Sequence, residues 1–130
     1  DDYNKAIKIN PSDYVYHYNR AIVKDNVGDY EGAIIDYSRV IELDNSVVSS
    51  YYKRGILRRK LKDYQGSIDD LTRTLLLDPK YIGAYKNRGI AKELMGDIKG
   101  ACIDWKQSLG LAKTDAIRWI KDQCRSMDIQ

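Results

Sequence analysis

Charged residues of opposite sign recur along the chain with one fixed step, and they could serve either catalysis or ion pairing. A step of 34 residues separates the members of two sets. The first set is Arg20, Arg54 and Arg88, and the second is Asp36, Asp70 and Asp104. A guanidinium beside a carboxylate could form an ion-binding or catalytic site. A catalytic site would be needed only once, however, whereas a half-buried charge needs a partner in every repeat. We therefore expect structural ion pairs, each joining an arginine on a first helix to an aspartate on a second helix.

The single histidine gives no support for a metal or catalytic site. His17 shares its column, at the same step, with Tyr51 and Tyr85, so we expect it to pack as an aromatic residue. Without a second histidine nearby, no zinc site of familiar spacing can be assembled. No phosphate-binding glycine loop, nucleophile elbow or paired-carboxylate site is recognisable either. The sequence thus predicts no enzyme, no metal and no cofactor.

The two cysteines leave three alternatives open. Cys102 and Cys124 are 22 residues apart and lack the close spacing of zinc ribbons. We expect a free, buried, inert pair. The second alternative is a disulfide that ties the last repeat to a closing helix, and it would favour an exported protein. The third is a reactive thiol, although no partner base is visible for it.

The elements that must position these residues repeat with the same step. It separates Asp29, Asp63 and Asp97 from one another, and many other columns follow it without an insertion. A period of about 34 residues with two helical segments per repeat is that of a helical solenoid, which displays a long concave surface. The pattern therefore favours binding over catalysis.

Each repeat contains a predicted turn between its two helices. In the first complete unit we expect helices over about 13–26 and 30–43. Gly28 can adopt the left-handed conformation after the first helix, and Asp29 can cap the second. Lys62 replaces the glycine in the second unit, where we expect backbone strain.

These columns resemble the tetratricopeptide repeat family over nearly the whole chain. The large and small residues of the family signature are, in the second unit, Tyr51, Gly55, Tyr64, Ser67, Leu71, Thr74 and Pro79. The resemblance implies an all-α, right-handed superhelical solenoid of antiparallel helix pairs. The segment from Ala101 to Trp105, followed by a helix ending near Cys124, is similar to the closing segment of many bacterial members.

The expected organisation comprises about three units with flanking helices. In chain order these are the end of a preceding repeat's second helix with its link (1–13), the units 14–47, 48–81 and 82–115, and a capping helix (116–130). Because residues 3–11 align with 37–45, we expect the chain to be a fragment of a longer array.

The composition narrows the partners that can be expected. The chain is 43% hydrophobic and 32% charged, and its net charge is +3. No apolar run approaches the roughly 20 residues that span a bilayer, and the charge is too small to indicate nucleic acid or membrane. The basic stretch 53–62 is a solvated helix face or a footprint for an acidic peptide, with nucleic acid a weaker alternative. No signal-like apolar stretch stands at the chain start, where a targeting segment is either absent or removed, so the location is not readable there. A cytoplasmic location is slightly favoured, and export is the alternative if Cys102 and Cys124 form a disulfide.

The resemblance also implies which residues line the concave groove. They come from the first helix of each unit and are Tyr18, Asn19, Ile22, Tyr52, Lys53, Ile56, Arg59, Lys86, Asn87 and Ile90. Asparagine amides can bond a peptide backbone and lysines can hold a carboxylate, although the asparagines could instead satisfy neighbouring helices. Some members of the family clamp the terminal carboxylate of chaperones with a set of Lys, Asn and Arg side chains. The corresponding residues here do not reproduce that set: Tyr18, Ile22, Lys53, Gly83 and Asn87.

Three functions therefore compete. The leading hypothesis is a protein–protein interaction scaffold that binds a peptide, acidic or C-terminal, or a partner domain in the groove. The alternative is a structural module that self-associates end to end through the orphan helix at 3–9. An RNA-binding repeat that uses the basic stretch 53–62 is the third.

Overall fold

The computed structural model describes residues 13–111 and 124–125, and these residues form helices only. The six long helices, in chain order, are α2 (Tyr14–Asn26), α3 (Tyr30–Leu43), α4 (Val48–Lys60), α5 (Tyr64–Leu77), α6 (Ile82–Leu94) and α7 (Ile98–Leu111). The all-α solenoid prediction is confirmed for this part of the chain. The predicted flanking helices fall on 1–12 and 112–130, which lie outside the described residues apart from Cys124 and Arg125.

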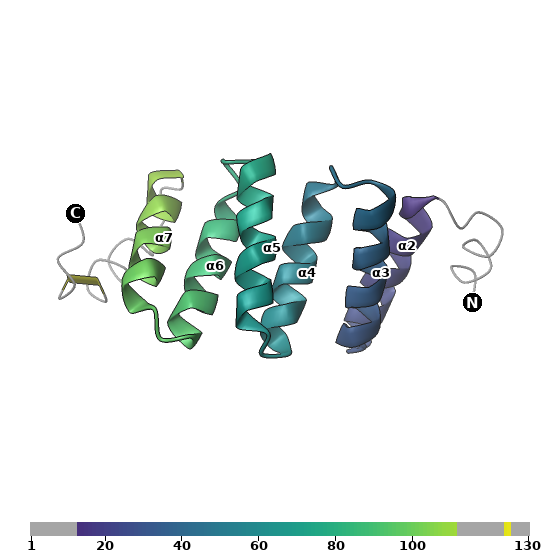
Figure 1. The fold of residues 1–130 in the computed structure, drawn as a ribbon, viewed down its shortest axis with the longest axis horizontal. Helices are drawn as coiled ribbons and strands as arrows, with labels where there is room; N and C mark the ends of the chain where they lie inside the picture. The colour runs from purple at the N-terminus through teal and green to yellow at the C-terminus, as the bar shows by residue number, and fades with distance from the viewer. Residues whose placement is uncertain (1–12, 112–123, 126–130) are drawn as a thin grey trace.

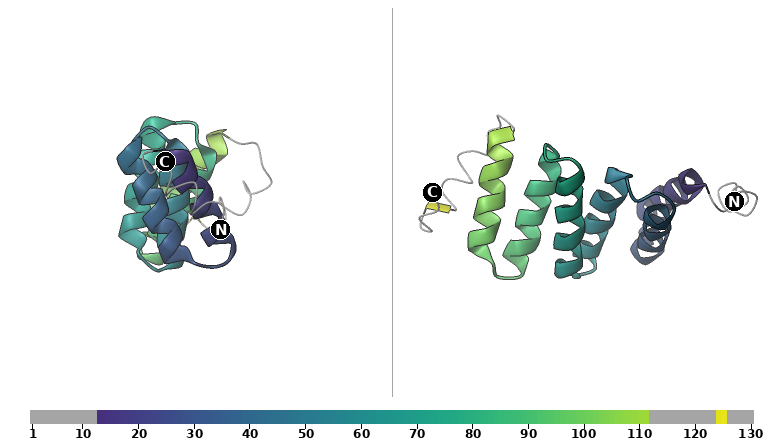
Figure 2. Two further views of the ribbon diagram at one scale, coloured as in Figure 1. Left: turned by 90° about the vertical axis from the view of Figure 1, so that its right-hand side faces the viewer. Right: turned by 45° about the horizontal axis from the view of Figure 1, so that its top comes forward.

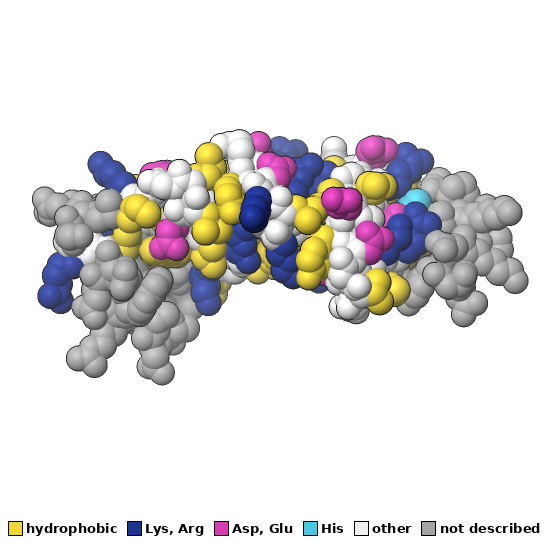
Figure 3. All heavy atoms as spheres, turned by 90° about the horizontal axis from the view of Figure 1, so that it is seen from below, with side chains coloured by type: hydrophobic (Ala, Val, Ile, Leu, Met, Phe, Trp, Pro, Cys, Tyr) yellow, Lys and Arg dark blue, Asp and Glu magenta, His cyan; other side chains and the backbone are white. Residues whose placement is uncertain are grey.

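The helices follow one another along the array in two layers, with α3, α5 and α7 in front of α2, α4 and α6 in Figure 1 (see also Figure 2). Each first helix packs against the second helix of its own unit, and each second helix packs against the next first helix. In addition, α4 contacts α6 directly, so first helices of neighbouring units approach each other. Viewed from the side of the turns within units, the described residues form an arc (Figure 3). The direct contact places the first helices on the inner, concave side of that arc.

The turn within each unit is built from a left-handed residue followed by an aspartate cap. Asp29, Asp63 and Asp97 accept from the backbone N–H groups three residues later at 3.0, 3.0 and 2.9 Å. The preceding residues have φ angles of +85° at Gly28, +67° at Lys62 and +88° at Gly96. The expected strain therefore falls on Lys62, because a side chain at positive φ crowds the backbone.

Replacing Lys62 with glycine is expected to stabilise the protein by about 0.5–1 kcal/mol. The gain is the left-handed penalty of roughly 1–2 kcal/mol less the extra unfolded-state entropy of glycine, roughly 0.5–1 kcal/mol. Urea unfolding followed by circular dichroism measures the difference. The reverse change, Gly28→Lys, is the matched control and should destabilise by a similar amount. A Lys62→Gly variant no more stable than the parent would contradict the strain.

The core lies between the two layers of helices. Tyr37, Leu71 and Trp105 occupy one column of the second helices and are 0%, 0% and 5% exposed. They face the small residues of the first helices, of which Ala21 is fully buried. This large-against-small packing fixes the orientation of every first helix, and hence which of its side chains reach the concave side.

Candidate functional site

The predicted groove residues lie on α2, α4 and α6. Their apolar column is only partly covered, since Ile22 and Ile56 are half-buried and Ile90 is 37% exposed. Lys86 is exposed, and Lys53 is half-buried on the adjacent helix. The inner face therefore has an apolar strip bordered by basic side chains.

Three groove residues form a polar network that joins two neighbouring units. Asn87 donates from Nδ2 to the Tyr52 hydroxyl at 3.0 Å and to the Gly83 carbonyl at 2.8 Å. Arg59 donates from Nη1 to Oδ1 of Asn87 at 2.7 Å. Both amide protons of Asn87 are therefore used within the chain. Of the two interpretations open for the asparagines, the geometry of Asn87 matches the one in which the amide satisfies neighbouring helices.

The ring of Tyr52 is fixed by its surroundings. It stacks at 4.6 Å between centroids on Tyr81, and its hydroxyl occupies the space that a Cβ at Gly83 would need. Burial raises the pKa of the Tyr52 phenol above its ordinary value, while the positive charge of Arg59 and the hydrogen bond from Asn87 act in the opposite direction. The phenol therefore stays neutral at physiological pH. The stacking and the hydrogen bond hold the ring in one position.

The lysines of the groove differ from the network residues. Among the described residues, neither Lys53 nor Lys86 makes a hydrogen bond or ion pair. Asp25 and Glu93 lie further along α2 and α6, in the same column as Arg59 on α4. The predicted groove thus has basic residues on α4 and α6, and acidic residues near the C-terminal ends of α2 and α6.

The repeated arginines and aspartates meet as the spacing predicts. In each unit the arginine donates twice to one carboxylate, at 2.7–2.9 Å, in the pairs Arg20–Asp36, Arg54–Asp70 and Arg88–Asp104. The aspartates are 1–3% exposed. Two of the arginines also reach back to the preceding unit, since Arg54 donates to Ser38 at 3.0 Å and Arg88 to Thr72 at 3.2 Å. Each of these two arginines therefore connects three helices.

Each buried aspartate has a second cationic partner, which we did not predict from the sequence. Lys24, Arg58 and Lys92 contact Asp36, Asp70 and Asp104 at 3.1, 3.0 and 3.0 Å. The interpretation of the stretch 53–62 as a solvated face with one internal pair was thus wrong for Arg58. The available signal was the shared repeat step, with each cation about one helical turn after the paired arginine.

The second cation also affects titration in the first unit. Burial tends to raise the pKa of Asp36, but the hydrogen bonds and positive charges of Arg20 and Lys24 outweigh it and hold that pKa below its ordinary value. A lowered folded-state pKa means that protons bind more weakly to the folded protein. The stabilisation by Asp36 is therefore present at neutral pH and is lost as the pH falls through the acidic range.

The comparisons with known proteins agree with this geometry. A family model described as tetratricopeptide repeat matches residues 2–35. The crystal structure of MamA superposes with a TM-score of 0.89 at 20% identity, covering 96% of this chain and 74% of that chain. The Arabidopsis OM64 TPR domain gives 0.79 at 22% identity, covering 88% and 95%. The second TPR of Spaghetti (RPAP3), bound to the HSP90 peptide SRMEEVD, gives 0.73 at 28% identity, covering 76% and 92%. No curated protein matches the chain.

The six helices have the fold of a tetratricopeptide array. Within this tetratricopeptide array, no helix in the described ranges is long and apolar enough to cross a membrane. The same ranges, 13–111 and 124–125, hold no group of three or more His, Cys, Asp or Glu side chains that could bind a metal ion. His17 is buried in its aromatic column, and its Nδ1 atom lies 3.9 Å from Asp36.

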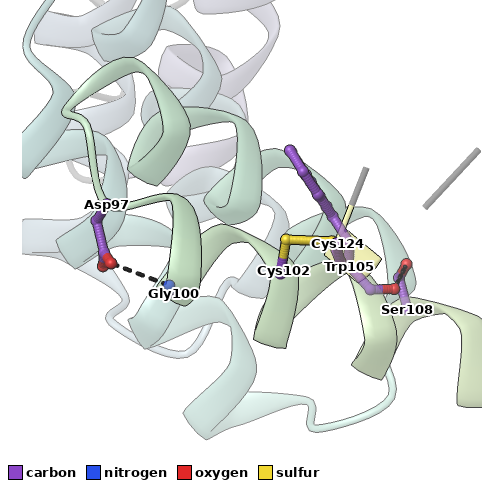
Figure 4. Close-up of a disulfide and its surroundings, with 6 residues drawn as sticks. All are labelled: Asp97, Gly100, Cys102, Trp105, Ser108 and Cys124. Carbon is purple, nitrogen blue, oxygen red and sulfur yellow. Dashed lines mark hydrogen bonds between the residues drawn. A yellow bond between two sulfur atoms is a disulfide. The ribbon is translucent and has the colours of Figure 1, made fainter. Parts of the chain in front are cut away.

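The cysteines of the tetratricopeptide array are bonded to each other. Cys102 on α7 forms a disulfide with Cys124, and their Cα atoms are 5.7 Å apart (Figure 4). The expectation of a free pair was therefore wrong. Both residues are almost fully buried, in one cluster with Ala101 and Trp105. The bond ties the last unit to a segment 22 residues further along the chain.

Proposed function

We propose that the inner face of α2, α4 and α6 binds an extended segment of another protein that carries an acidic group. Tetratricopeptide repeats commonly mediate protein–protein interaction and are generally non-catalytic. The observation that carries the proposal is the pair Lys53 and Lys86, which have no carboxylate partner among the described residues although every buried aspartate there has two cations. An acidic group placed between these lysines would complete charge-assisted hydrogen bonds.

The distribution of charge favours a particular kind of segment. The acidic group would lie near α4 and α6, where the basic residues of the groove lie. Near the C-terminal ends of α2 and α6, Asp25 and Glu93 disfavour further acidic residues by like-charge repulsion. The partner is therefore a segment with a local acidic group and apolar or neutral residues around it, rather than a long acidic run.

The chaperone peptide bound by the second Spaghetti domain serves as a comparison probe. That protein binds SRMEEVD, but the five positions implied by the family clamp are Tyr18, Ile22, Lys53, Gly83 and Asn87 in this chain. Only one of them is a lysine, and the amide of Asn87 is already used. We expect this array to bind SRMEEVD more weakly than a peptide selected on its own groove.

Reversing the two lysines is expected to abolish selection of acidic peptides. A displayed library of random peptides is selected on the parent protein and on Lys53→Glu/Lys86→Glu. The parent should enrich acidic peptides, and the affinity of a selected peptide should fall by about tenfold or more in the variant because attraction becomes repulsion. Raising the salt concentration should weaken parent binding, since exposed charges are screened over roughly 8–10 Å.

The matched control reverses two cations on the second helices. Arg73 on α5 and Lys99 on α7 are exposed and make no ion pair with another described residue. Arg73→Glu/Lys99→Glu changes the net charge equally and should leave peptide selection unchanged. If both double variants lose binding to the same extent, net charge and not the groove governs binding, and the proposal fails.

End-to-end association is the second candidate function, and one observation favours it. Val23, Leu57 and Ala91 share a column; Leu57 and Ala91 are 1% and 0% exposed, whereas Val23 is 37% exposed. Its apolar surface therefore lies open on the side of α2 where a preceding repeat would pack. The orphan helix of that hypothesis lies outside the described residues. Concentration-dependent sedimentation of the parent, without enrichment of any peptide, would favour this function over peptide binding.

We also propose that the protein works in an oxidising compartment. The support is the disulfide between two buried cysteines, because such bonds persist in exported proteins and are rare where thiols are kept reduced.

A further inference from the structure

A hollow beside the predicted groove residue Tyr18 was not identified from the sequence. It lies where α2 and α4 begin, has a volume of about 230 Å³, and is lined by Tyr14, Val15, Tyr18, Val47 and Ser49. Pockets for drug-sized ligands measure about 300–1,000 Å³. The hollow is therefore of a size for one side chain rather than for a whole small molecule, and its lining is largely apolar.

The edge of the hollow carries a pair of hydroxyl groups that can bond a peptide unit. Tyr18 donates its hydroxyl proton to Oγ of Ser49 at 2.9 Å. The proton of Ser49 then remains to donate, and the Tyr18 oxygen can still accept. One donor beside one acceptor is the complement of the C=O and N–H groups of an extended backbone.

We propose that this hollow binds an aliphatic side chain of the same segment whose acidic group lies at Lys53 and Lys86. This inference rests on the proposed function and adds a second anchor to it. The Tyr18–Ser49 pair would hold the backbone beside the aliphatic residue. The ligand is thus a bipartite motif, with one apolar and one acidic anchor.

The helix geometry sets the spacing of the two anchors. Ser49 and Lys53 are four residues apart on α4 and so lie on one face of that helix, one turn apart. The hollow lies between α2 and α4, while the two lysines lie on α4 and α6. The two anchors are therefore separated by about the distance between the first helices of neighbouring units. Directly packed helices are about 8–10 Å apart, and first helices of neighbouring units, which make few contacts with each other, are at least that far apart. Because an extended chain advances about 3.3 Å per residue, the aliphatic residue should lie about three or more positions from the acidic one.

The random-peptide selection described above tests this motif when it is repeated on Val15→Trp. Val15 lines the hollow and is 44% exposed, so an indole there should fill it without disturbing the core. The parent should enrich an aliphatic position at a fixed spacing of about three or more residues from the acidic one, in one chain direction. In a selected peptide, changing that residue to alanine should cost about tenfold in affinity. On Val15→Trp the aliphatic position should disappear while the acidic one remains.

Two controls make the outcomes distinct. Val27→Trp places the same side chain on a turn residue that is 76% exposed and away from the hollow, and it should leave both positions enriched. Tyr18→Phe keeps the ring and removes the hydroxyl, so affinity should fall while the aliphatic preference stays. If the acidic position is enriched without an aliphatic one, or if Val15→Trp leaves both, the hollow inference is overturned and the proposed function stands. If no acidic position is enriched, the proposed function itself fails.

Discussion

Replacing Asp70 with asparagine is expected to destabilise the protein by about 3–5 kcal/mol, because a buried ion pair loses one partner. Asp70 is 3% exposed and accepts from Arg54 and Arg58. The neutral amide would leave Arg54 without its counter-charge and close to the guanidinium of Arg58, which would keep only the carboxylate of Asp63 at 3.9 Å. Arg54 would also be less well held against Ser38, so the connection between the first two units should weaken. Urea unfolding at neutral pH measures the loss.

The neighbouring residue provides the matched control. Asp69 is exposed on the same helix and accepts a hydrogen bond only from Gln65 among the described residues. Asp69→Asn removes the same charge and should change stability by less than about 0.5 kcal/mol. A double-mutant cycle between Arg54 and Asp70 should show strong coupling. Equal, small effects of Asp69→Asn and Asp70→Asn would show that the repeated pairs do not hold the helices together.

Reducing the disulfide is expected to lower stability by about 3 kcal/mol, since opening a bridge of this span restores conformational freedom to the unfolded chain. The bridged cysteines pack in the cluster that includes Trp105 on α7 (Figure 4). The loss should therefore appear first in the last unit, as faster amide exchange in α7 than in α4. Unfolding with and without reductant, compared with Cys102→Ala/Cys124→Ala, measures it.

The double variant separates the bond from other effects of the reductant. It lacks the bridge, so reductant should leave its stability unchanged. Because both cysteines are buried, alkylation is carried out in denaturant; without prior reduction it should label neither Cys102 nor Cys124 in the natively produced parent, as the oxidising compartment requires. A parent whose thiols react after reduction, yet whose unfolding midpoint does not move, would show that the bond contributes nothing to stability.

Much of the fold could be predicted because the same repeat step holds in all three units. This step locates the helix ends within about a residue, the left-handed turn at Lys62 and the arginine–aspartate pairs, because each of these depends on contacts within one unit. The second cations were predictable in principle from the same step. Arg58 was instead assigned to a solvated face, since a run of basic residues hides which of them turns toward the aspartate.

Features that join different units could not be predicted in this way. The amide of Asn87 is occupied by Tyr52 and Arg59, which belong to the preceding unit. The counterparts of Arg59 in the other units are the acidic residues Asp25 and Glu93, so the repeat step does not predict this network. The hollow is lined by residues of two units, so its shape depends on how α2 and α4 are placed relative to each other. That placement cannot be derived from the sequence pattern of one repeat. The cysteine pairing depends on a tertiary contact between Cys124 and α7, so the residue spacing alone left the alternatives open.

The measurement that tests the central claim most directly is a map of amide chemical shifts during titration with a peptide selected on the parent protein. Binding in the groove predicts that the largest changes occur on α2, α4 and α6, around Ser49, Lys53 and Lys86. The exposed faces of α5 and α7, around Arg73 and Lys99, should change little. Changes concentrated on α5 and α7, with the inner face unaffected, would contradict the account.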